Sequence, residues 1–255
     1  HLDEPVVVQY GYFLAGLARA ALKHSIAYGR PVSELIWERW PATAKLAFLA
    51  VFFSLFFALP LGTLAAVRAG GPLDHAAMTL SLLGISMPSF WLGPLLIVIF
   101  SVHFNLFPVS GAEEARSIVL PALTLGAAMA ALLSRMVRAQ RLETLSRDYR
   151  RTARAKGLSP WAVVVKHALR NALVPVLTIV GVQFGVLLSG AIITEKVFAW
   201  PGLGSLLLEG IFQRDYPVVQ GCVLAISLVY VAVNLVTDFL YGVLDPRIRV
   251  GGEGA

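Results

Sequence analysis

Five stretches of this chain are continuously apolar, and they predict how it folds. They cover approximately residues 46–67, 76–102, 118–133, 171–194 and 216–237, and none contains Asp, Glu, Lys or Arg. A helix rises about 1.5 Å per residue, so roughly 20 apolar residues cross the hydrocarbon core of a bilayer. Membrane-spanning strands would alternate polar and apolar positions instead. The pattern therefore predicts an all-α fold class, a polytopic bundle of transmembrane helices.

Composition and charge support a membrane protein. Of the 255 residues, 57% are hydrophobic and 14% are charged, whereas about one quarter of a soluble domain is charged. The net charge of +6 comes from one segment, because residues 135–170 contain ten Lys or Arg against two acids. A single basic loop in an otherwise neutral chain is typical of a cytoplasmic loop. This distribution argues against a soluble enzyme and against a nucleic-acid partner.

The basic loop also predicts the orientation and the domain organisation. The positive-inside rule places the loop at about 135–170 in the cytoplasm. Alternation then makes residues 1–41 an extracytoplasmic segment, 42–245 the transmembrane domain and 246–255 a cytoplasmic tail. The first segment starts outside the membrane without a signal-peptide pattern. We therefore expect a sixth apolar helix upstream of His1.

The sequence lacks the common patterns of catalytic chemistry. It contains no G-x-x-x-x-G-K-[ST], H-E-x-x-H or G-x-S-x-G, which would indicate a phosphate-binding loop, a zinc protease or a serine hydrolase. Cys222 is the only cysteine, and the five histidines lie far apart. Spans without acids argue against an intramembrane hydrolase and a proton relay. We expect no catalytic residue, no metal site and no cofactor on this chain.

Bent or polar positions inside the spans are the candidates for a translocation path. Met87 and Ser89 flank a proline in the second stretch, and Pro-broken helices in transporters often line cavities. Gln183 lies within a G-x-x-x-G spacing, and Asn234 lies near the inner end of the last span. Simpler roles remain open, because proline kinks occur without function and Gln183 can hydrogen-bond a neighbouring helix.

The basic loop has the pattern of two short helices joined by a turn. Residues 148–158 read DYRRTARAKGL, in which Ala, Arg and Lys favour helix and Gly157 permits a left-handed turn. Ser159 and Pro160 then provide an N-cap and a first-turn proline for a second helix. A protruding helix of this kind suits docking into a groove of a soluble partner. The alternative is a basic hairpin that lies on anionic lipid.

RTARAKG followed by ALRNALVP resembles the cytoplasmic loop of ABC importer permeases, whose general pattern begins EAA and reaches a glycine after three further residues. The three lead positions here are Arg151, Thr152 and Ala153, so the acidic lead residue is absent. This form resembles the dipeptide, oligopeptide and nickel importer permeases. The resemblance extends in order through GRPVSELIWERWPAT, FPVSG, TEKVFAWPGLG, RDYPVVQG and LDPRIR, which together span nearly the whole chain.

The resemblance implies a six-span permease whose loop helix docks into a cleft of an ATP-hydrolysing subunit. The implied coupling residues are Tyr149, Arg150, Arg151, Thr152, Ala153, Arg154, Ala155, Lys156, Gly157 and Leu158. ATP and Mg²⁺ would then be held by partner subunits. The implied partners are a second permease, two ABC ATPase subunits, an extracytoplasmic solute-binding protein and the lipid bilayer, in the inner membrane of a bacterium or archaeon.

The outer loop after the fourth span contains the candidates for docking of the solute-binding protein, which are Glu195, Trp200, Pro201 and Gly202. Trp200 also fits the role of an interfacial anchor. The chain is therefore expected to form half of a translocation pathway for di- or oligopeptides or a similar small solute. A secondary transporter and a membrane scaffold with a lipid-binding loop are the alternatives, and the sequence does not distinguish peptides from nickel chelates, glutathione-like compounds or sugars.

Overall fold

The computed structural model describes residues 4–18, 23–144 and 168–244. The elements in these ranges are helices: α1 (Val6–Ala18), α2 (Val32–Val67), α3 (Pro72–Ser86), α4 (Ser89–Leu96), the π-helical η1 (Ile97–His103), the 3₁₀-helical η2 (Ala115–Ile118), α5 (Val119–Thr144), α8 (Ala168–Val197), α9 (Leu203–Phe212) and α10 (Tyr216–Leu244). The expected all-α fold class is confirmed.

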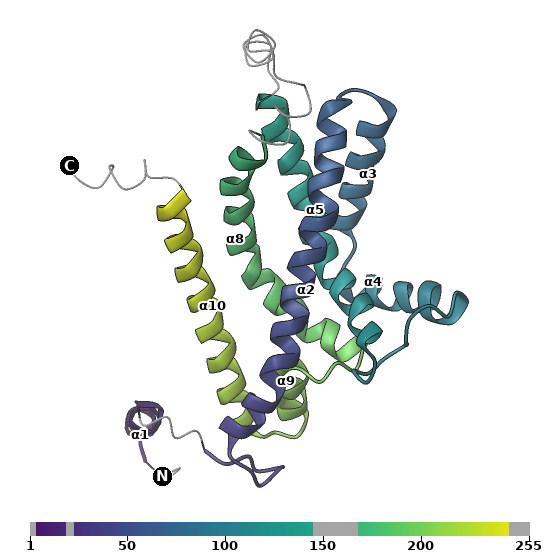
Figure 1. Cartoon of the computed structure of the whole chain (residues 1–255). Helices are drawn as coiled ribbons and strands as arrows, with labels where there is room; N and C mark the ends of the chain where they lie inside the picture. Colours follow the sequence, from purple (N-terminus) through teal and green to yellow (C-terminus); the bar gives the residue numbers. More distant parts are fainter. Residues whose placement is uncertain (1–3, 19–22, 145–167, 245–255) are drawn as a thin grey trace, which may run out of the picture.

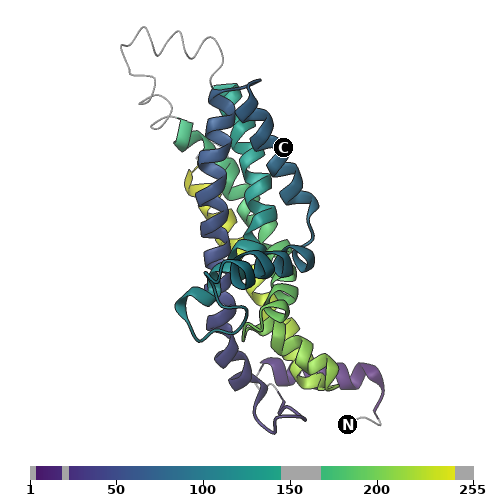
Figure 2. The same cartoon turned by 90° about the vertical axis from the view of Figure 1, so that its right-hand side faces the viewer.

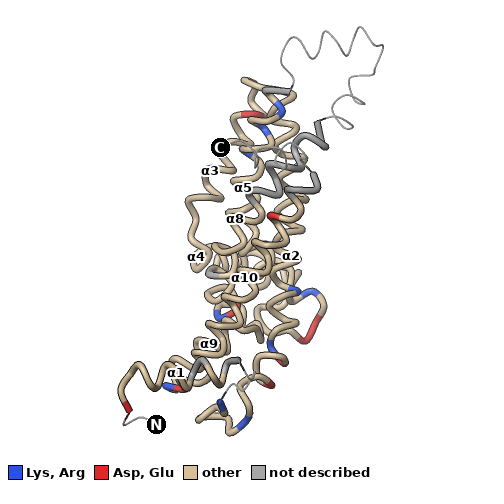
Figure 3. The backbone as a smooth tube through the Cα atoms, turned by 90° about the vertical axis from the view of Figure 1, so that its left-hand side faces the viewer, with Lys and Arg blue, Asp and Glu red and all other residues tan. Residues whose placement is uncertain are grey.

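The long helices run lengthwise through the molecule beside one another (Figures 1 and 2). Among the described residues, α2, a segment containing α5 and α10 are each long and apolar enough to cross a membrane. α8 covers the fourth predicted stretch with 30 residues. Most Lys, Arg, Asp and Glu residues lie toward the two ends of the bundle, and few charged positions lie between them (Figure 3). This separation of charge agrees with a bundle that crosses a bilayer.

α2 is longer than the first predicted stretch. It runs for 36 residues from Val32 and contains two internal prolines, Pro41 and Pro60. It therefore continues through residue 41, where we expected the extracytoplasmic segment to end. We call the end of the bundle at the α2–α3 turn, residues 68–71, the cytoplasmic end, following the charge-based orientation. We call the opposite end, where α9 lies, the outer end.

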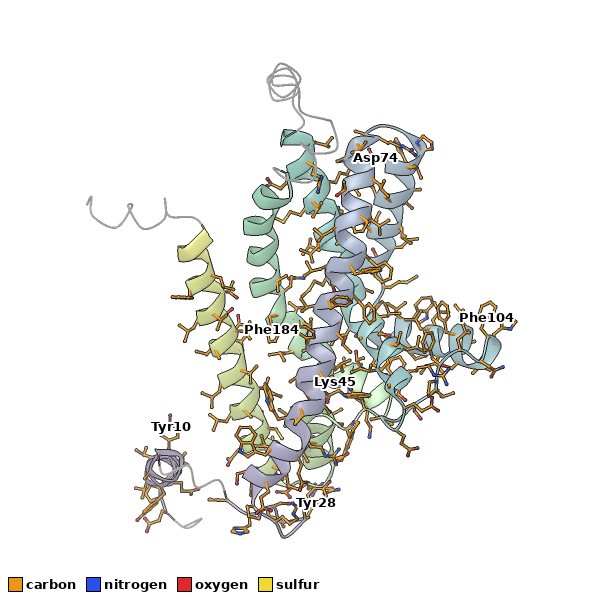
Figure 4. The ribbon with its side chains drawn as sticks, in the orientation of Figure 1. Tyr10, Tyr28, Lys45, Asp74, Phe104 and Phe184 are labelled. Carbon is orange, nitrogen blue, oxygen red and sulfur yellow. The ribbon has the colours of Figure 1, made fainter. Side chains whose placement is uncertain are left out.

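The second predicted span, 76–102, is broken at Pro88, where the sequence indicated an interruption. α3 and the α4–η1 segment are bent by 110° relative to each other. Pro88 restricts the preceding residue, and Met87 accordingly adopts an extended backbone with φ −83° and ψ 118°. The segment Ser89–His103, which we call the side arm, projects sideways from the bundle (Figure 1), with Phe104 beyond its end (Figure 4).

Small residues bring α2 and α5 into close contact. A Cβ atom on Gly126 would lie 2.6 Å from the carbonyl oxygen of Ala50, and one on Gly62 would lie 2.8 Å from Cβ of Val137. The Ser54 hydroxyl donates to the Gly126 carbonyl oxygen over 2.8 Å. Because lipid is as apolar as a leucine side chain, helices in a membrane associate through such close packing and hydrogen bonds. These contacts fix α5 against α2 along much of its length.

Candidate functional site

A cavity of about 130 Å³ lies beside the break between α3 and α4. The break, α5 and α8 each contribute to its wall. The lining residues are Met87, Ser89, Leu92, Thr124, Leu125, Ala127, Ala128, Met129, Gln183, Val186, Leu187 and Gly190. A mostly apolar wall with a few polar groups is typical of a small-molecule site.

Three of the four translocation-path candidates share this wall. Met87, Ser89 and Gln183 come from two segments about 95 positions apart in the sequence, and the bend at Pro88 brings them together. Asn234 lies on α10 and is not among the lining residues. Sequence reasoning missed Thr124, because a threonine in an apolar helix has no distinctive pattern. The roles of Met87, Ser89, Gln183 and Asn234 as translocation residues stay predictions.

The polar groups of the cavity differ in their hydrogen bonding. The Thr124 hydroxyl donates to the Leu120 carbonyl oxygen of its own helix over 2.8 Å. Within the described part of the chain, neither the Ser89 hydroxyl nor the Gln183 amide has a hydrogen-bond partner. A half-buried amide in an apolar wall is costly unless a ligand, water or another chain pairs with it. The cavity therefore offers free donors and acceptors to a polar solute.

The glycines beside Gln183 explain why its side chain reaches the cavity. A Cβ on Gly181 would overlap Thr237, and one on Gly185 would lie 2.7 Å from the Tyr230 ring, so this face of α8 packs closely on α10. Residue 183 lies midway between these glycines and therefore on the opposite face of the helix. The G-x-x-x-G spacing thus positions α8, and Gln183 points away from the α8–α10 contact.

At the outer end, Glu195 joins α8 to α2 and α9. Its side chain is 0% exposed. One carboxyl oxygen accepts from the Thr43 hydroxyl over 2.7 Å, and the other accepts from the Ser205 backbone N–H over 2.9 Å. Thr43 in turn accepts from the Leu203 backbone N–H over 2.7 Å. An acidic group at the first turn of α9 satisfies N–H groups that have no partner within the helix.

This burial corrects part of the docking prediction. Trp200 is only 4% exposed, and its indole N–H donates to the Ala42 carbonyl oxygen over 3.0 Å. Gly202 is also buried, because its Cα approaches the Glu195 carboxyl group so closely that a Cβ would overlap it. Glu195, Trp200 and Gly202 therefore hold the turn together and do not present a surface. Pro201 is half-buried, and its contact with a binding protein stays a prediction.

A second buried acid fastens the outer end. Asp215 accepts hydrogen bonds from the Ser25 hydroxyl and from the Ala27 backbone N–H, which tie the segment before α2 to the start of α10. Burial alone would raise the pKa of this carboxyl group, but these bonds outweigh burial and lower its pKa below the ordinary value. The outer ends of α2 and α10 are thereby held together in the ionised state of Asp215.

The predicted coupling residues, 149–158, lie outside the described residues, so their contacts with an ATPase stay a prediction. Among the residues that the structure describes, no three His, Cys, Asp or Glu side chains form a group that could hold a metal ion.

Comparison with known proteins gives a consistent result. Residues 58–250 match the family described as binding-protein-dependent transport system inner membrane component. The chain is 42% identical over 279 residues to the dipeptide transport system permease protein DppB of Escherichia coli strain K12, covering 97% of this chain and 82% of that protein. It is 45% identical over 248 residues to the glutathione transport system permease protein GsiC of Salmonella choleraesuis strain SC-B67. This match covers 97% of this chain and 81% of that protein.

The fold is similar to that of a solved transporter chain. A structure described as an inward facing conformation of the MetNI methionine ABC transporter matches with a TM-score of 0.71 at 20% identity, over 84% of this chain and 97% of that chain. At this identity the match concerns the fold alone.

Proposed function

The chain belongs to the family of binding-protein-dependent transport inner membrane components, the permease subunits of ABC importers, and we propose on this premise that it forms half of a pathway that imports peptides across an inner membrane. The relatives that share more than two fifths of its sequence are named for dipeptide and glutathione transport. Both solutes carry peptide bonds, whose N–H and C=O groups need hydrogen-bond partners inside an apolar environment.

The cavity is the observation that carries this proposal. Ser89 and Gln183 supply donors and acceptors without partners in the described part of the chain, and the rest of the wall is mainly apolar. A second permease would supply the other half of a pathway that forms between two half-pores. The permease contributes no covalent chemistry, and ATP with Mg²⁺ binds on two partner ATPase subunits that dock at residues 149–158. A solute-binding protein delivers the peptide at the outer end.

Gln183 provides a test of the cavity. Gln183→Leu keeps the approximate volume and removes one amide, so peptide uptake should fall about fivefold, as expected for the loss of roughly one hydrogen bond. Gln220→Leu is the matched control, because it makes the same change at an exposed amide of α10 that does not line the cavity. Uptake of labelled dipeptide by proteoliposomes measures both variants. Equal uptake by Gln183→Leu and wild type would contradict the assignment of the cavity to the pathway.

Gly157 provides a test of the ATPase partner. Gly157→Asp places a charged side chain where the loop sequence needs a turn, so the variant should insert normally but recover less than about one tenth of the wild-type ATPase in a pull-down. The control is Gly111→Ala, because Gly111 has a positive φ of 91° and lies in an outer loop with open space around it. Full peptide uptake by Gly157→Asp would contradict the role of residues 149–158 in coupling. Failure of any ATPase to associate with folded wild type would overturn the importer proposal.

A further inference from the structure

A partly buried ion pair joins α3 to α5 at the cytoplasmic end. The Arg138 guanidinium donates from Nε to Oδ1 of Asp74 over 2.6 Å and from its terminal nitrogen to Oδ2 over 2.7 Å. The Gly70 backbone N–H adds a third bond to Oδ2 over 2.8 Å. The Asp74 side chain is only 4% exposed and that of Arg138 is 28% exposed. A two-point contact of this kind fixes orientation as well as distance.

Further contacts continue along the same two helices toward the middle of the bundle. The hydroxyls of Ser81 and Ser134 hydrogen-bond each other over 2.7 Å in a buried position. A Cβ on Gly84 would lie 3.1 Å from Cβ of Ala131, so the helices are close there as well. These contacts and the ion pair lie in antiparallel order on α3 and α5. The two helices are therefore held together from the first turn of α3 almost to its end.

The contacts between α3 and α5 extend from the side of the predicted coupling residues to the side of the cavity. Arg138 precedes the predicted coupling residues by 11 positions, on the helix that leads toward them. α3 ends at Ser86, and the next residue, Met87, lines the cavity. Figure 4 places Asp74 at the cytoplasmic end of the bundle, where α2 turns into α3. A displacement of α5 at this end would therefore act on α3 through the ion pair of Asp74 and Arg138.

We propose that Asp74 and Arg138 are positioning residues that transmit movement of the coupling loop to the break between α3 and α4, and so control access to the cavity. The inference rests on the proposed function. α3 has only 15 residues and contacts α5 along most of its length, so we expect it to move with α5 as a rigid unit. Ser89 lies on the α4 side of the break and lines the cavity. The accessibility of its side chain therefore reports whether the cavity changes when the coupling loop moves.

The experiment uses the assembled complex of this chain with its partner permease and ATPases in proteoliposomes. In a Cys222→Ala background, Ser89→Cys supplies the only thiol on this chain, and the rate of maleimide labelling is measured with and without ATP. We expect ATP to change the rate, and Asp74→Asn to reduce that change by between about twofold and thirtyfold, the range for residues that carry coupling between sites. Arg138→Lys, which keeps the charge and loses the two-point contact, should show a smaller reduction.

Arg30→Gln is the matched control, because Arg30 forms an exposed ion pair with Glu34 at the outer end. It should leave the ATP response unchanged. Peptide uptake per ATP hydrolysed is measured in parallel, because a purely structural defect would lower the amount of complex but not this ratio. An assembled Asp74→Asn complex with the wild-type ATP response and the wild-type ratio would overturn the inference. A wild type that responds to ATP but takes up no peptide would contradict the peptide substrate and leave the role of the ion pair standing.

Discussion

Glu195→Ala is expected to lower the free energy of unfolding by about 3 kcal/mol, since it leaves at least two buried donors without an acceptor and each costs roughly 1–3 kcal/mol. The donors are the Thr43 hydroxyl and the Ser205 backbone N–H. They come from α2 and α9, so the loss separates the three helices that meet at the outer end. The apparent melting temperature of the purified permease in detergent measures this effect.

Variants of Thr43 separate the hydrogen bonds from the volume of the site. Thr43→Ser keeps the hydroxyl that links Glu195 to the Leu203 backbone N–H and should stay close to wild type. Thr43→Val keeps the shape and removes the hydroxyl. It should lower the free energy of unfolding by about half as much as Glu195→Ala does. A melting temperature of Glu195→Ala within the error of wild type would show that the outer end does not depend on this acid.

The second large effect is expected from Gly126→Leu, which should prevent α2 and α5 from packing and lower stability by about 3 kcal/mol, the upper end for overpacking. Its Cβ would meet backbone at 2.6 Å, from the Ala50 carbonyl oxygen, and the Ser54 hydroxyl at 2.9 Å. Backbone in the middle of a packed helix cannot move aside as a flexible side chain can. The fraction of protein that elutes as a single species from a detergent sizing column, together with its melting temperature, measures the result.

Gly11→Ala is the control for the loss of a glycine in a helix. No atom lies within 4 Å of a Cβ at Gly11, and α1 is an ordinary helix there. This change should leave the melting temperature unchanged or raise it slightly, because alanine favours helix by about 1 kcal/mol over glycine. If Gly126→Leu and Gly11→Ala behaved alike, close packing between α2 and α5 would not be a source of stability.

The sequence predicted the helices well because a bilayer leaves the backbone few options. Continuous apolar stretches have to satisfy their own N–H and C=O groups, and helices do so within one segment. The stretches at 46–67, 118–133 and 216–237 accordingly fall within α2, α5 with η2, and α10. The motifs between the spans predicted the family, and the relatives confirm it. The sequence predicted less about the burial and hydrogen-bond partners of individual side chains.

The sequence by itself thus determined the fold class, the order of the spans and the family, since these depend on local hydropathy and on short motifs. Only the tertiary structure decided the 110° angle of the bend at Met87, the burial of Glu195 and the pairing of Asp74 with Arg138. Thr43 and Glu195 lie 152 positions apart, and Asp74 and Arg138 lie 64 apart. Hydropathy places each of these residues near the end of a span but does not distinguish an exposed charge from a buried one. That difference depends on which helices pack together, because a charged group becomes buried only where a neighbouring helix supplies its hydrogen bonds.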